Sequence, residues 1–219
     1  MLSPPVMRTA RAVIFDLDGT LVDSLGDIIT HLNAAMADHG MPTRTQIEIS
    51  EWVGYGAEQL VQRAVPDAAS VGPVLATFRA RYRARPVIET AIYAGLPALL
   101  DGLATTRKLA VLSNKPHELT LAVVEQVLGR WPFAVVHGQR GDRPRKPDPI
   151  ALLGVCRELG IAPSDCVMVG DSEVDIQTAR AADIRGICVT WGLRDPVALR
   201  AANPDIAVDT VAELAALFS

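Results

Sequence analysis

Short apolar runs alternate with amphipathic segments along most of the chain, and this alternation limits the folds that the chain can adopt. Five apolar runs are each followed at once by polar or small residues: Arg11–Phe15, Leu109–Leu112, Ala134–Val136, Cys166–Val169 and Ile187–Val189. Three segments between the later runs place apolar residues at i, i+3 and i+4, the spacing of a helix: Pro116–Leu128, Asp148–Leu159 and Glu173–Ala182. This alternation predicts an α/β fold with a doubly wound parallel sheet covered on both faces. We expect Ile206–Val208 to add an edge strand before a helix over Val211–Phe218.

The region from about Ser24 to Pro86 breaks this alternation, because it holds no convincing strand pattern. Ser24 can cap a helix that Gly40 closes, and its apolar stripe consists of Leu25, Ile28, Ile29, Leu32 and Met36. Two further helical patterns run through Glu58–Val65 and through Val74, Leu75, Phe78 and Tyr82. We therefore predict a helical cap domain of residues 22–87, inserted after the first strand into an α/β core of residues 1–21 and 88–219.

The composition argues against several classes of protein. With 21 basic and 25 acidic residues the chain carries a net charge of −4 and has no long basic run, so we expect no nucleic-acid partner. No apolar segment approaches membrane-spanning length, and Met1 to Arg8 lack the apolar core of a signal peptide, so we expect no membrane partner. The three cysteines, Cys156, Cys166 and Cys188, lie among apolar residues without CxxC spacing. They favour buried free thiols in a reducing cytoplasm over zinc ligands or disulfides.

Two carboxylates close the first apolar run, in the stretch Val13–Thr20. Asp16 and Asp18 are spaced i, i+2, and strand side chains alternate, so the tip of a strand would present both on one side of the chain. Two like charges held together are costly unless a cation or a shared proton compensates them. The pair therefore indicates a site. Gly19 comes next and permits a tight turn that exposes backbone amides.

Further polar residues follow the later runs: Ser113, Asn114, Lys115, Lys146, Asp171 and Asp175. Ligands of doubly wound sheets bind at the carboxyl ends of the strands, so these residues would share one rim with the first two carboxylates. Mg²⁺ prefers a few carboxylates, water and substrate phosphate over a full protein cage. The rim would also offer a hydroxyl and an amide as hydrogen-bond donors to phosphate oxygens. A lysine there would offset the negative charge of the phosphate. The set predicts a magnesium-dependent site for a phosphate ester.

These motifs, taken in order, resemble those of the haloacid dehalogenase (HAD) superfamily, in the branch that carries a helical, C1-type cap after the first motif. The resemblance covers nearly the whole chain and implies a Rossmann-like core. Within the branch the chain is most similar to phosphoglycolate phosphatases. That closer likeness rests on four segments: Leu21–Ser24, Trp52–Gly56, Tyr93–Gly95 and Thr190–Gly192.

The resemblance implies catalytic and metal-binding roles. Asp16 would attack phosphorus and become an aspartyl-phosphate, and Asp18 would protonate the leaving oxygen and then deprotonate the attacking water. A Mg²⁺ cofactor would be held by Asp16, by the backbone carbonyl of Asp18 and by Asp171. Asp175 would be a further ligand or the outer group that orients the ligands. Lys146 would offset negative charge in the transition state.

Substrate binding would fall to both parts of the chain. Ser113, the amide of Asn114, Lys146 and a hydrogen bond from Thr20 would hold the phosphoryl group. Cap candidates are Gly54, Tyr55 and Gly56, where small residues admit a close ligand, and Arg44, Gln59 and Arg63 as partners of a substrate carboxylate. His117 follows Ser113 closely enough to touch substrate, although the start of a helix explains it as well. We interpret Arg79, Arg81, Arg83 and Arg85 as a solvated helix face.

The expected function is hydrolysis of a small phosphomonoester, with 2-phosphoglycolate as the first candidate. A phosphomutase of the β-phosphoglucomutase type stays open, as does a phosphatase for pyrophosphate, a sugar phosphate or a nucleotide. A signalling receiver module also uses an acidic cluster, a phosphorylated Asp and a lysine, but it has no need of the helical insertion. The expected partner is a small phosphorylated metabolite, and the chain would act as a monomer or a homodimer.

Overall fold

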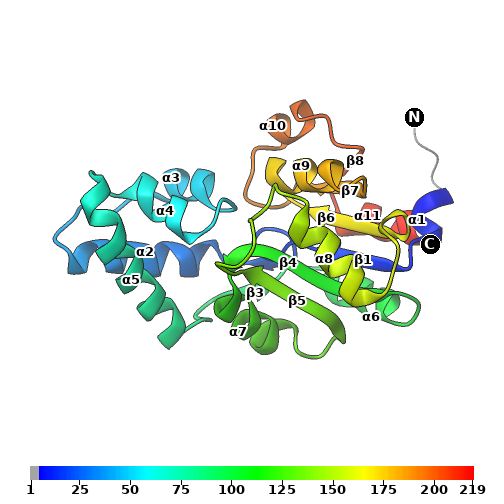
Figure 1. Ribbon diagram of the computed structural model, residues 1–219, viewed down its shortest axis with the longest axis horizontal. Helices are drawn as coiled ribbons and strands as arrows, with labels where there is room; N and C mark the ends of the chain where they lie inside the picture. The colour runs from blue at the N-terminus through cyan, green and yellow to red at the C-terminus, as the bar shows by residue number, and fades with distance from the viewer. Residues whose placement is uncertain (1–4) are drawn as a thin grey trace.

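Six parallel strands form the central sheet in the computed structural model, which describes residues 5–219. The strands are β1 (Ala12–Phe15), β4 (Lys108–Pro116), β5 (Phe133–Gln139), β6 (Cys166–Gly170), β7 (Arg185–Val189) and β8 (Ile206–Val208). Their order in the sheet is β5-β4-β1-β6-β7-β8 (Figure 1). The chain passes from β1 to β4 and β5 on one side and then returns to β6, β7 and β8 on the other. The strand order therefore reverses at β1, where such sheets bind ligands, and the predicted fold class is confirmed.

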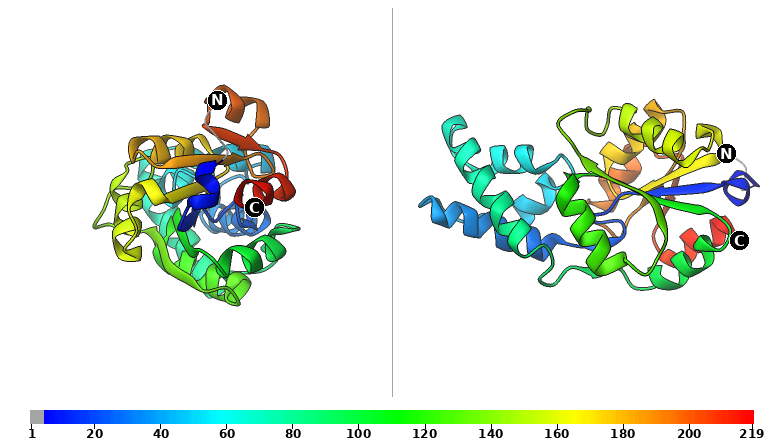
Figure 2. Two further views of the ribbon diagram at one scale, coloured as in Figure 1. Left: turned by 90° about the vertical axis from the view of Figure 1, so that its right-hand side faces the viewer. Right: turned by 60° about the horizontal axis from the view of Figure 1, so that its bottom comes forward.

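Both faces of the sheet are covered, because the central strands are apolar along their whole length. All four residues of β1 are buried; Val13 and Phe15 face one hydrophobic cluster, and Ala12 and Ile14 face another. The first cluster includes residues of α6 (Leu96–Ala104), α7 (His117–Leu128) and α11 (Val211–Phe218). The second includes residues of α8 (Ile150–Leu159) and α9 (Glu173–Ala181). Figure 2 shows the sheet between these two layers of helices.

Four strands, β4, β5, β6 and β7, are longer than the apolar runs predict, and β4 and β5 exceed them most. β4 continues through Ser113, Asn114 and Lys115 to Pro116, which pairs with Gln139 of β5 after a register shift. The polar residues that we expected after the strand thus lie on it, and α7 begins at His117 rather than at Pro116. The reason is that backbone pairing with a neighbouring strand continues where the side chains are no longer apolar. The sequence pattern also does not predict α6, or the short helices α1 (Pro5–Thr9) and α10 (Pro196–Ala201).

Four helices lie beyond the carboxyl end of β1 (Figures 1 and 2). They are α2 (Leu25–Asp38), α3 (Gln46–Trp52), α4 (Ala57–Ala64) and α5 (Ala68–Ala84), and we refer to them as the cap helices. A third hydrophobic cluster joins them, so they pack on one another through their own core. The chain leaves and rejoins the sheet through an antiparallel pair, β2 (Val22–Asp23) and β3 (Ala91–Ile92). The domain boundaries at 22–87 stay a prediction.

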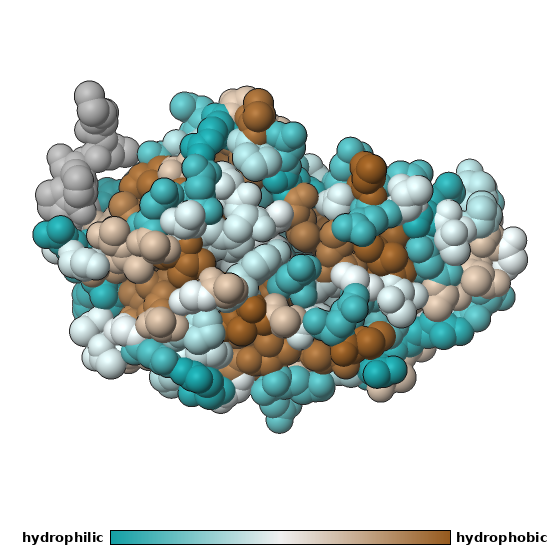
Figure 3. All heavy atoms as spheres, turned by 180° about the vertical axis from the view of Figure 1, so that it is seen from behind, coloured by the Kyte–Doolittle hydropathy of each residue, from teal (hydrophilic) through white to brown (hydrophobic). Residues whose placement is uncertain are grey.

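The surface mixes hydrophobic and hydrophilic residues on the face shown in Figure 3. Among the helices of residues 5–219, none combines the length and the hydropathy that a membrane crossing requires. The cysteines are buried and form no disulfide within this part of the chain. The expected burial of three free thiols is therefore confirmed.

Asp27, a fully buried carboxylate at the start of α2, holds the segment that returns from the cap helices to the sheet. It accepts hydrogen bonds from the backbone N–H groups of Ile88, Glu89 and Thr90 at 3.0, 2.9 and 3.1 Å, and one from the Thr90 hydroxyl. Burial by itself would raise the pKa of Asp27, but these hydrogen bonds outweigh it and lower the pKa below its ordinary value. The outgoing and returning connections are thereby fixed to each other.

We predict that Asp27→Asn lowers the free energy of unfolding by about 1–3 kcal/mol, because an amide cannot accept all of these bonds and leaves buried donors unpaired. A carboxylate with a depressed folded pKa stabilises the fold above its unfolded pKa and loses that contribution as pH falls through the folded value. The difference between wild type and variant should therefore shrink below about pH 4. Urea unfolding at pH 7 and pH 3 measures both effects, with the exposed Glu125→Gln as control; an unchanged midpoint at pH 7 would contradict the role of Asp27.

Candidate active site

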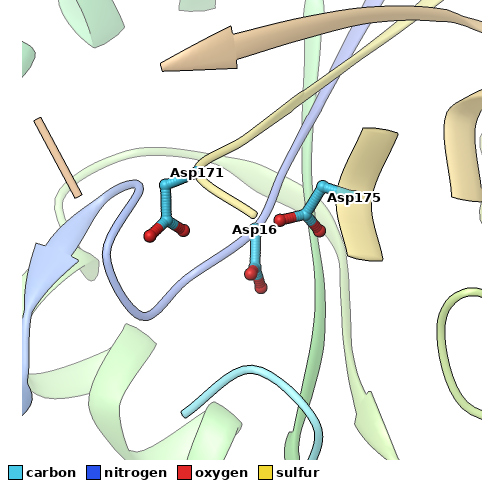
Figure 4. Close-up of side chains that lie close together, drawn as sticks. All are labelled: Asp16, Asp171 and Asp175. Carbon is cyan, nitrogen blue, oxygen red and sulfur yellow. The ribbon is translucent and has the colours of Figure 1, made fainter. Parts of the chain in front are cut away.

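Three carboxylates from separate elements meet at the carboxyl ends of β1 and β6. Asp16 follows β1 directly, Asp171 follows β6, and Asp175 lies in the first turn of α9. Each offers an oxygen within 4.8 Å of the oxygens of the other two, and all three residues are buried. Figure 4 shows the carboxylates gathered around one space. The spacing in the sequence predicts this meeting, because the ends of adjacent parallel strands share one edge of the sheet.

The start of α9 orients Asp175. Ser172 caps the helix: its hydroxyl accepts from the backbone N–H of Asp175 at 3.3 Å. In return, Asp175 Oδ2 accepts from the backbone N–H of Ser172 at 3.2 Å and from its hydroxyl at 2.6 Å. This reciprocal pair is a capping box, which satisfies helix donors that otherwise lack partners. Because Oδ2 is used in the cap, Oδ1 is left to face the other carboxylates.

Asp171 lies between two glycines and accepts two hydrogen bonds. Thr20 donates its hydroxyl proton to Oδ1 at 3.0 Å, and the backbone N–H of Leu193 donates to Oδ2 at 2.9 Å. A Cβ atom at Gly19 or at Gly192 would lie 2.2 or 2.3 Å from Asp171 Oδ2, which is closer than any side chain permits. Gly19 also has φ +84°, in the left-handed region that favours glycine. The Thr20 hydroxyl is therefore bound to Asp171 in this structure, and the contact to the phosphoryl group that the resemblance implies stays a prediction.

Lys146 is the buried cation of this cluster. Its Nζ lies 3.0 Å from Asp16 Oδ1 and 2.7 Å from Asp175 Oδ1, and it donates to the carbonyl of Leu112 at 3.0 Å. Asn114 positions the lysine, because its side chain donates to the carbonyl of Lys146 at 3.0 Å and accepts from its N–H at 2.9 Å. The lysine therefore stands where the sequence predicts it.

One ammonium group does not balance three carboxylates. Burial raises the pKa of Asp16 to about 7; Lys146 opposes this rise, and Asp175 and Asp171 add to it. Burial and the nearby Asp175 likewise raise the pKa of Asp171 to about 7. Closely spaced oxygen donors with excess negative charge suit a hard divalent cation. The three carboxylates of this structure thus fit the Mg²⁺ site that the sequence predicts.

Asp18 has different partners from Asp16. Its carboxylate accepts from Lys115 Nζ at 3.0 and 3.2 Å and from the Ser24 hydroxyl at 2.6 Å, and it is not part of the three-carboxylate cluster. Lys115 also donates to the hydroxyl of Tyr82, on cap helix α5, at 2.7 Å. Ser24 precedes α2 as predicted, but its side chain makes no capping bond because it donates to Asp18 instead.

Sequence reasoning missed the roles of Lys115 and Ser24. The motif that contains Lys115 was identified, and a signal was present in its spacing. Lys115 stands two residues after Ser113 on β4, so both can serve the same side of the strand, and both line the cavity described next. No comparable signal exists for Ser24, because a serine before a helix is already explained as a cap.

A cavity of about 40 Å³ separates these groups from the cap helices. Its polar floor comes from the sheet: Asp16, Asp18, Ser113, Asn114 and Lys115. Its remaining lining is mostly apolar: Ile28, Val53, Gly54, Gly56, Ala57, Leu60, Phe78, Tyr82, Pro116 and Leu119. Gly54 and Gly56 have φ +99° and +92°, and the carbonyl of Gly54 accepts from the Asn114 side chain at 2.9 Å. The structure therefore brings Gly54 and Gly56 to the cavity, as the sequence predicts.

Other predicted cap residues lie outside the cavity lining. Arg44 donates through Nε to the carbonyl of Ala64 at 2.7 Å, and Gln59 does not reach the lining. Arg63 stacks on the ring of Tyr55, 4.5 Å from its centroid, and the Tyr55 hydroxyl bonds to Glu173. None of the three is part of the cavity lining, and their role toward a substrate carboxylate stays a prediction. Their helical spacing did not reveal which side of the cap faces the sheet.

His117 and the cap arginines also have definite places. His117 begins α7 and accepts from the N–H of Gly138 at 3.2 Å, outside the cavity lining. Arg81 and Arg83 pair with Asp38 and Glu118 on the surface, which fits a solvated face. Arg79 differs, because it lines a wider groove of about 500 Å³ outside the cavity, and further arginines of that groove are Arg140, Arg143 and Arg145.

We predict that, without metal, wild type loses thermal stability relative to Asp171→Asn as pH rises from about 4 to about 7. A carboxyl whose folded pKa is raised stabilises the fold while it is protonated, and it loses this contribution as pH rises through the folded value, here about 7. Magnesium at pH 8 should then raise the melting temperature of wild type more than that of the variant, because the ion binds only the folded state. Thermal melts in EDTA and in Mg²⁺ across this range test both points. Parallel pH curves for the two proteins would refute this account of Asp171.

Comparisons with known proteins extend these observations. A family model described as haloacid dehalogenase-like hydrolase matches residues 13–189. A phosphoglycolate phosphatase of Chromobacterium violaceum is 36% identical over 219 residues, covering 95% of this chain and 96% of the relative. A phosphoglycolate phosphatase of Xanthomonas campestris is 33% identical over 202 residues, covering 89% and 91%.

Known structures agree with the fold. A crystal structure from Lactobacillus delbrueckii subsp. bulgaricus, of a candidate phosphoglycolate phosphatase, has a TM-score of 0.89 and 30% identity. The match covers 96% of this chain and 98% of that one. A haloacid dehalogenase-like protein of Streptococcus pneumoniae has a TM-score of 0.87 at 21% identity, which supports the fold alone.

Proposed function

Since the chain belongs to the haloacid dehalogenase-like hydrolase family and is a phosphoric monoester hydrolase, we propose that it hydrolyses 2-phosphoglycolate with Mg²⁺, through a phosphorylated Asp16. The observation that carries the mechanism is the position of Asp16, which is buried between Lys146 and two further carboxylates at the floor of a small cavity. The names of the curated relatives support the choice of substrate.

The metal site would consist of Asp16, Asp171 and Asp175, with the backbone carbonyl of Asp18 as a further oxygen ligand. When bound there, Mg²⁺ supplies positive charge to the carboxylates and to the phosphoryl oxygens. Asp175 already pairs with Lys146 and with Ser172. It can therefore act as a ligand or as the group that orients the others, and both roles stay open.

Asp16 is oriented for attack by contacts to one of its two oxygens. The backbone N–H of Leu17 donates to Oδ1 at 2.7 Å, and Lys146 Nζ lies 3.0 Å from the same atom. We assign the attack on phosphorus to Oδ2, for which residues 5–219 supply no hydrogen-bond donor. The Oδ2–P bond forms as the P–O bond to the leaving group breaks. Lys146 favours the ionised form of Asp16 and offsets charge on the phosphoryl group.

Asp18 would complete the two steps. It gives a proton to the oxygen of the departing glycolate, and then takes a proton from the water that attacks the phosphorylated Asp16. That attack releases inorganic phosphate and restores the carboxylate of Asp16. Ser113 lines the cavity beside both carboxylates and would hold phosphoryl oxygens together with the backbone amide of Asn114. The apolar cap residues keep bulk water away from the acyl-phosphate.

The size of the cavity also supports a small substrate. A volume of about 40 Å³ holds only a few water-sized groups, and its walls are close-packed apolar side chains of the cap helices. A two-carbon leaving group suits such a space better than a sugar or a nucleoside. Together with the names of the curated relatives, this supports 2-phosphoglycolate ahead of the sugar phosphates and nucleotides considered from the sequence.

We predict that Asp16→Asn lowers kcat by at least about 10³-fold while the fold is retained, because the amide is nearly isosteric but cannot attack phosphorus. Phosphate release and circular dichroism of the purified variant measure the two effects. The exposed Glu125→Gln variant controls for purification. Retention of most activity would contradict the assignment of Asp16 as nucleophile.

The substrate assignment predicts that phosphate release requires Mg²⁺, stops in EDTA and is fastest with 2-phosphoglycolate. The comparison set is β-glucose 1-phosphate, pyrophosphate, a nucleoside monophosphate and p-nitrophenyl phosphate, ranked by kcat/KM. Faster hydrolysis of another member would replace the substrate and keep the mechanism. Movement of the phosphoryl group from one hydroxyl of a sugar to another, with no release of inorganic phosphate, would favour the mutase instead.

A further inference from the structure

The cavity has one cationic side chain in its lining, that of Lys115. The other charged groups that line it are the carboxylates of Asp16 and Asp18, and within residues 5–219 no arginine reaches it. Lys146 lies beneath this floor, paired with Asp16 and Asp175. A substrate that carries a second anionic group besides its phosphoryl group therefore meets one cation in this lining, Lys115, which is itself paired with Asp18. The proposed metal and phosphoryl sites assign no role to this lysine.

Lys115 is held rigidly by groups from the sheet and from the cap. The residue is 7% exposed, and its Nζ lies 3.0 Å from Asp18 Oδ1 and 2.7 Å from the hydroxyl of Tyr82. The same ammonium lies 4.4 Å from the centroid of the Tyr82 ring. Tyr82 in turn stacks on His31, with centroids 4.6 Å apart, and meets the edge of Phe78. Such a packed pair is organised before any ligand arrives, which lowers the entropy cost of binding.

Both members of the pair can donate a hydrogen bond to an anion. Lys115 Nζ forms an ion pair with the Asp18 carboxylate at 3.0 Å, as an ammonium group does. Burial raises the pKa of Tyr82 to about 12, which keeps its hydroxyl proton. That hydroxyl accepts from Lys115, and residues 5–219 offer no acceptor for its own proton. A carboxylate at this point would receive the O–H of Tyr82 and would share the Lys115 ammonium with Asp18.

The position of the pair matches the chemistry of the proposed substrate. In 2-phosphoglycolate one CH₂ group separates the carboxylate from the ester oxygen that Asp18 must reach. Because Lys115 Nζ lies 3.0 Å from Asp18, a carboxylate beside that ester oxygen comes within reach of the ammonium. We propose that Lys115 and Tyr82 form the subsite for the substrate carboxylate, an inference that rests on the proposed function. Selection of the carboxylate then comes from a lysine on β4 and a tyrosine on α5.

The groove arginines are the alternative partners for a carboxylate, and their positions argue against them. Arg79, Arg140, Arg143 and Arg145 line the wider groove and are absent from the cavity lining. Arg145 donates to the carbonyl of Tyr55 at 3.3 Å, and Arg143 lies 3.2 Å from His137 Nδ1. The groove shares Gly56, Ala57, Asn114 and Pro116 with the cavity, but among these cations Lys115 alone contacts Asp18. Arg79→Gln therefore serves as a matched control that removes a cation from outside the subsite.

The test compares 2-phosphoglycolate with ethyl phosphate, in which a methyl group replaces the carboxylate. For Lys115→Met we expect the ratio of kcat/KM values between the two substrates to fall about 10- to 100-fold, the effect of one charged hydrogen bond. Tyr82→Phe keeps the packing ring and should lower the ratio about 3- to 10-fold through the loss of one neutral donor. Lys115→Arg keeps the charge and should retain part of the preference. Arg79→Gln should leave the ratio unchanged within about twofold.

The outcomes separate the two proposals. A role of Lys115 only through Asp18 would lower kcat for both substrates alike and leave the ratio unchanged; that result overturns the subsite, while the proposed function stands. If Lys115→Met does not fold, an unchanged ratio for Tyr82→Phe overturns the subsite equally. A wild-type enzyme without preference for 2-phosphoglycolate over ethyl phosphate would refute the proposed substrate, and the subsite with it.

Discussion

Asp16, Asp171 and Asp175 present their oxygens within 4.8 Å of one another, and one buried ammonium, that of Lys146, lies among them. In a medium of low dielectric such carboxylates repel one another strongly. They stay together because the sheet fixes their backbone positions and because Lys146, Thr20 and Ser172 bind them. β1 pairs with β4 on one side and β6 on the other, with a hydrophobic cluster on each face. The stability of the apolar sheet thus maintains a site whose own charges oppose folding, and the proposed Mg²⁺ would relieve that opposition.

The two carboxylates spaced i, i+2 after β1 illustrate how neighbours in sequence acquire different chemistry. Asp16 contacts Lys146 and belongs to the cluster beneath the cavity. Asp18 contacts Lys115, which also binds Tyr82 of a cap helix. The group proposed to move protons is therefore connected through one lysine to the cap. Any displacement of α5 that moves Tyr82 changes the surroundings of Asp18, so the position of the cap and the readiness of the proton donor are physically coupled.

Sequence reasoning located the parts of the site that lie at strand ends, and it missed those that depend on contacts between distant elements. Asp16 and Asp171 could be placed together because β1 and β6 are adjacent parallel strands, whose carboxyl ends share one edge of the sheet. Lys146 lies in the loop between β5 and α8, and only the motif resemblance implied its role. Lys115 and Asp18 are 97 positions apart in the sequence, and no local sequence pattern around either residue predicts their contact. Arg44 was an attractive carboxylate partner, yet it binds the carbonyl of Ala64. Amphipathic spacing shows which face of a helix is buried but not what that face is buried against.

The cap helices contribute mostly apolar side chains to the walls of the cavity. Ile28, Leu60 and Phe78 enclose the site on the side of the cap helices. Apolar walls exclude water but provide no hydrogen bond or opposite charge to a buried anion. A second anionic group on the substrate must then reach the floor, where Lys146 is already shared between two carboxylates. Lys115 is the cation that remains, and Tyr82 is the cap residue whose hydroxyl stands beside it. The cap helices thus exclude water and contribute the hydroxyl of Tyr82. The positive charge that selects the ligand is that of Lys115, which lies on strand β4 of the sheet.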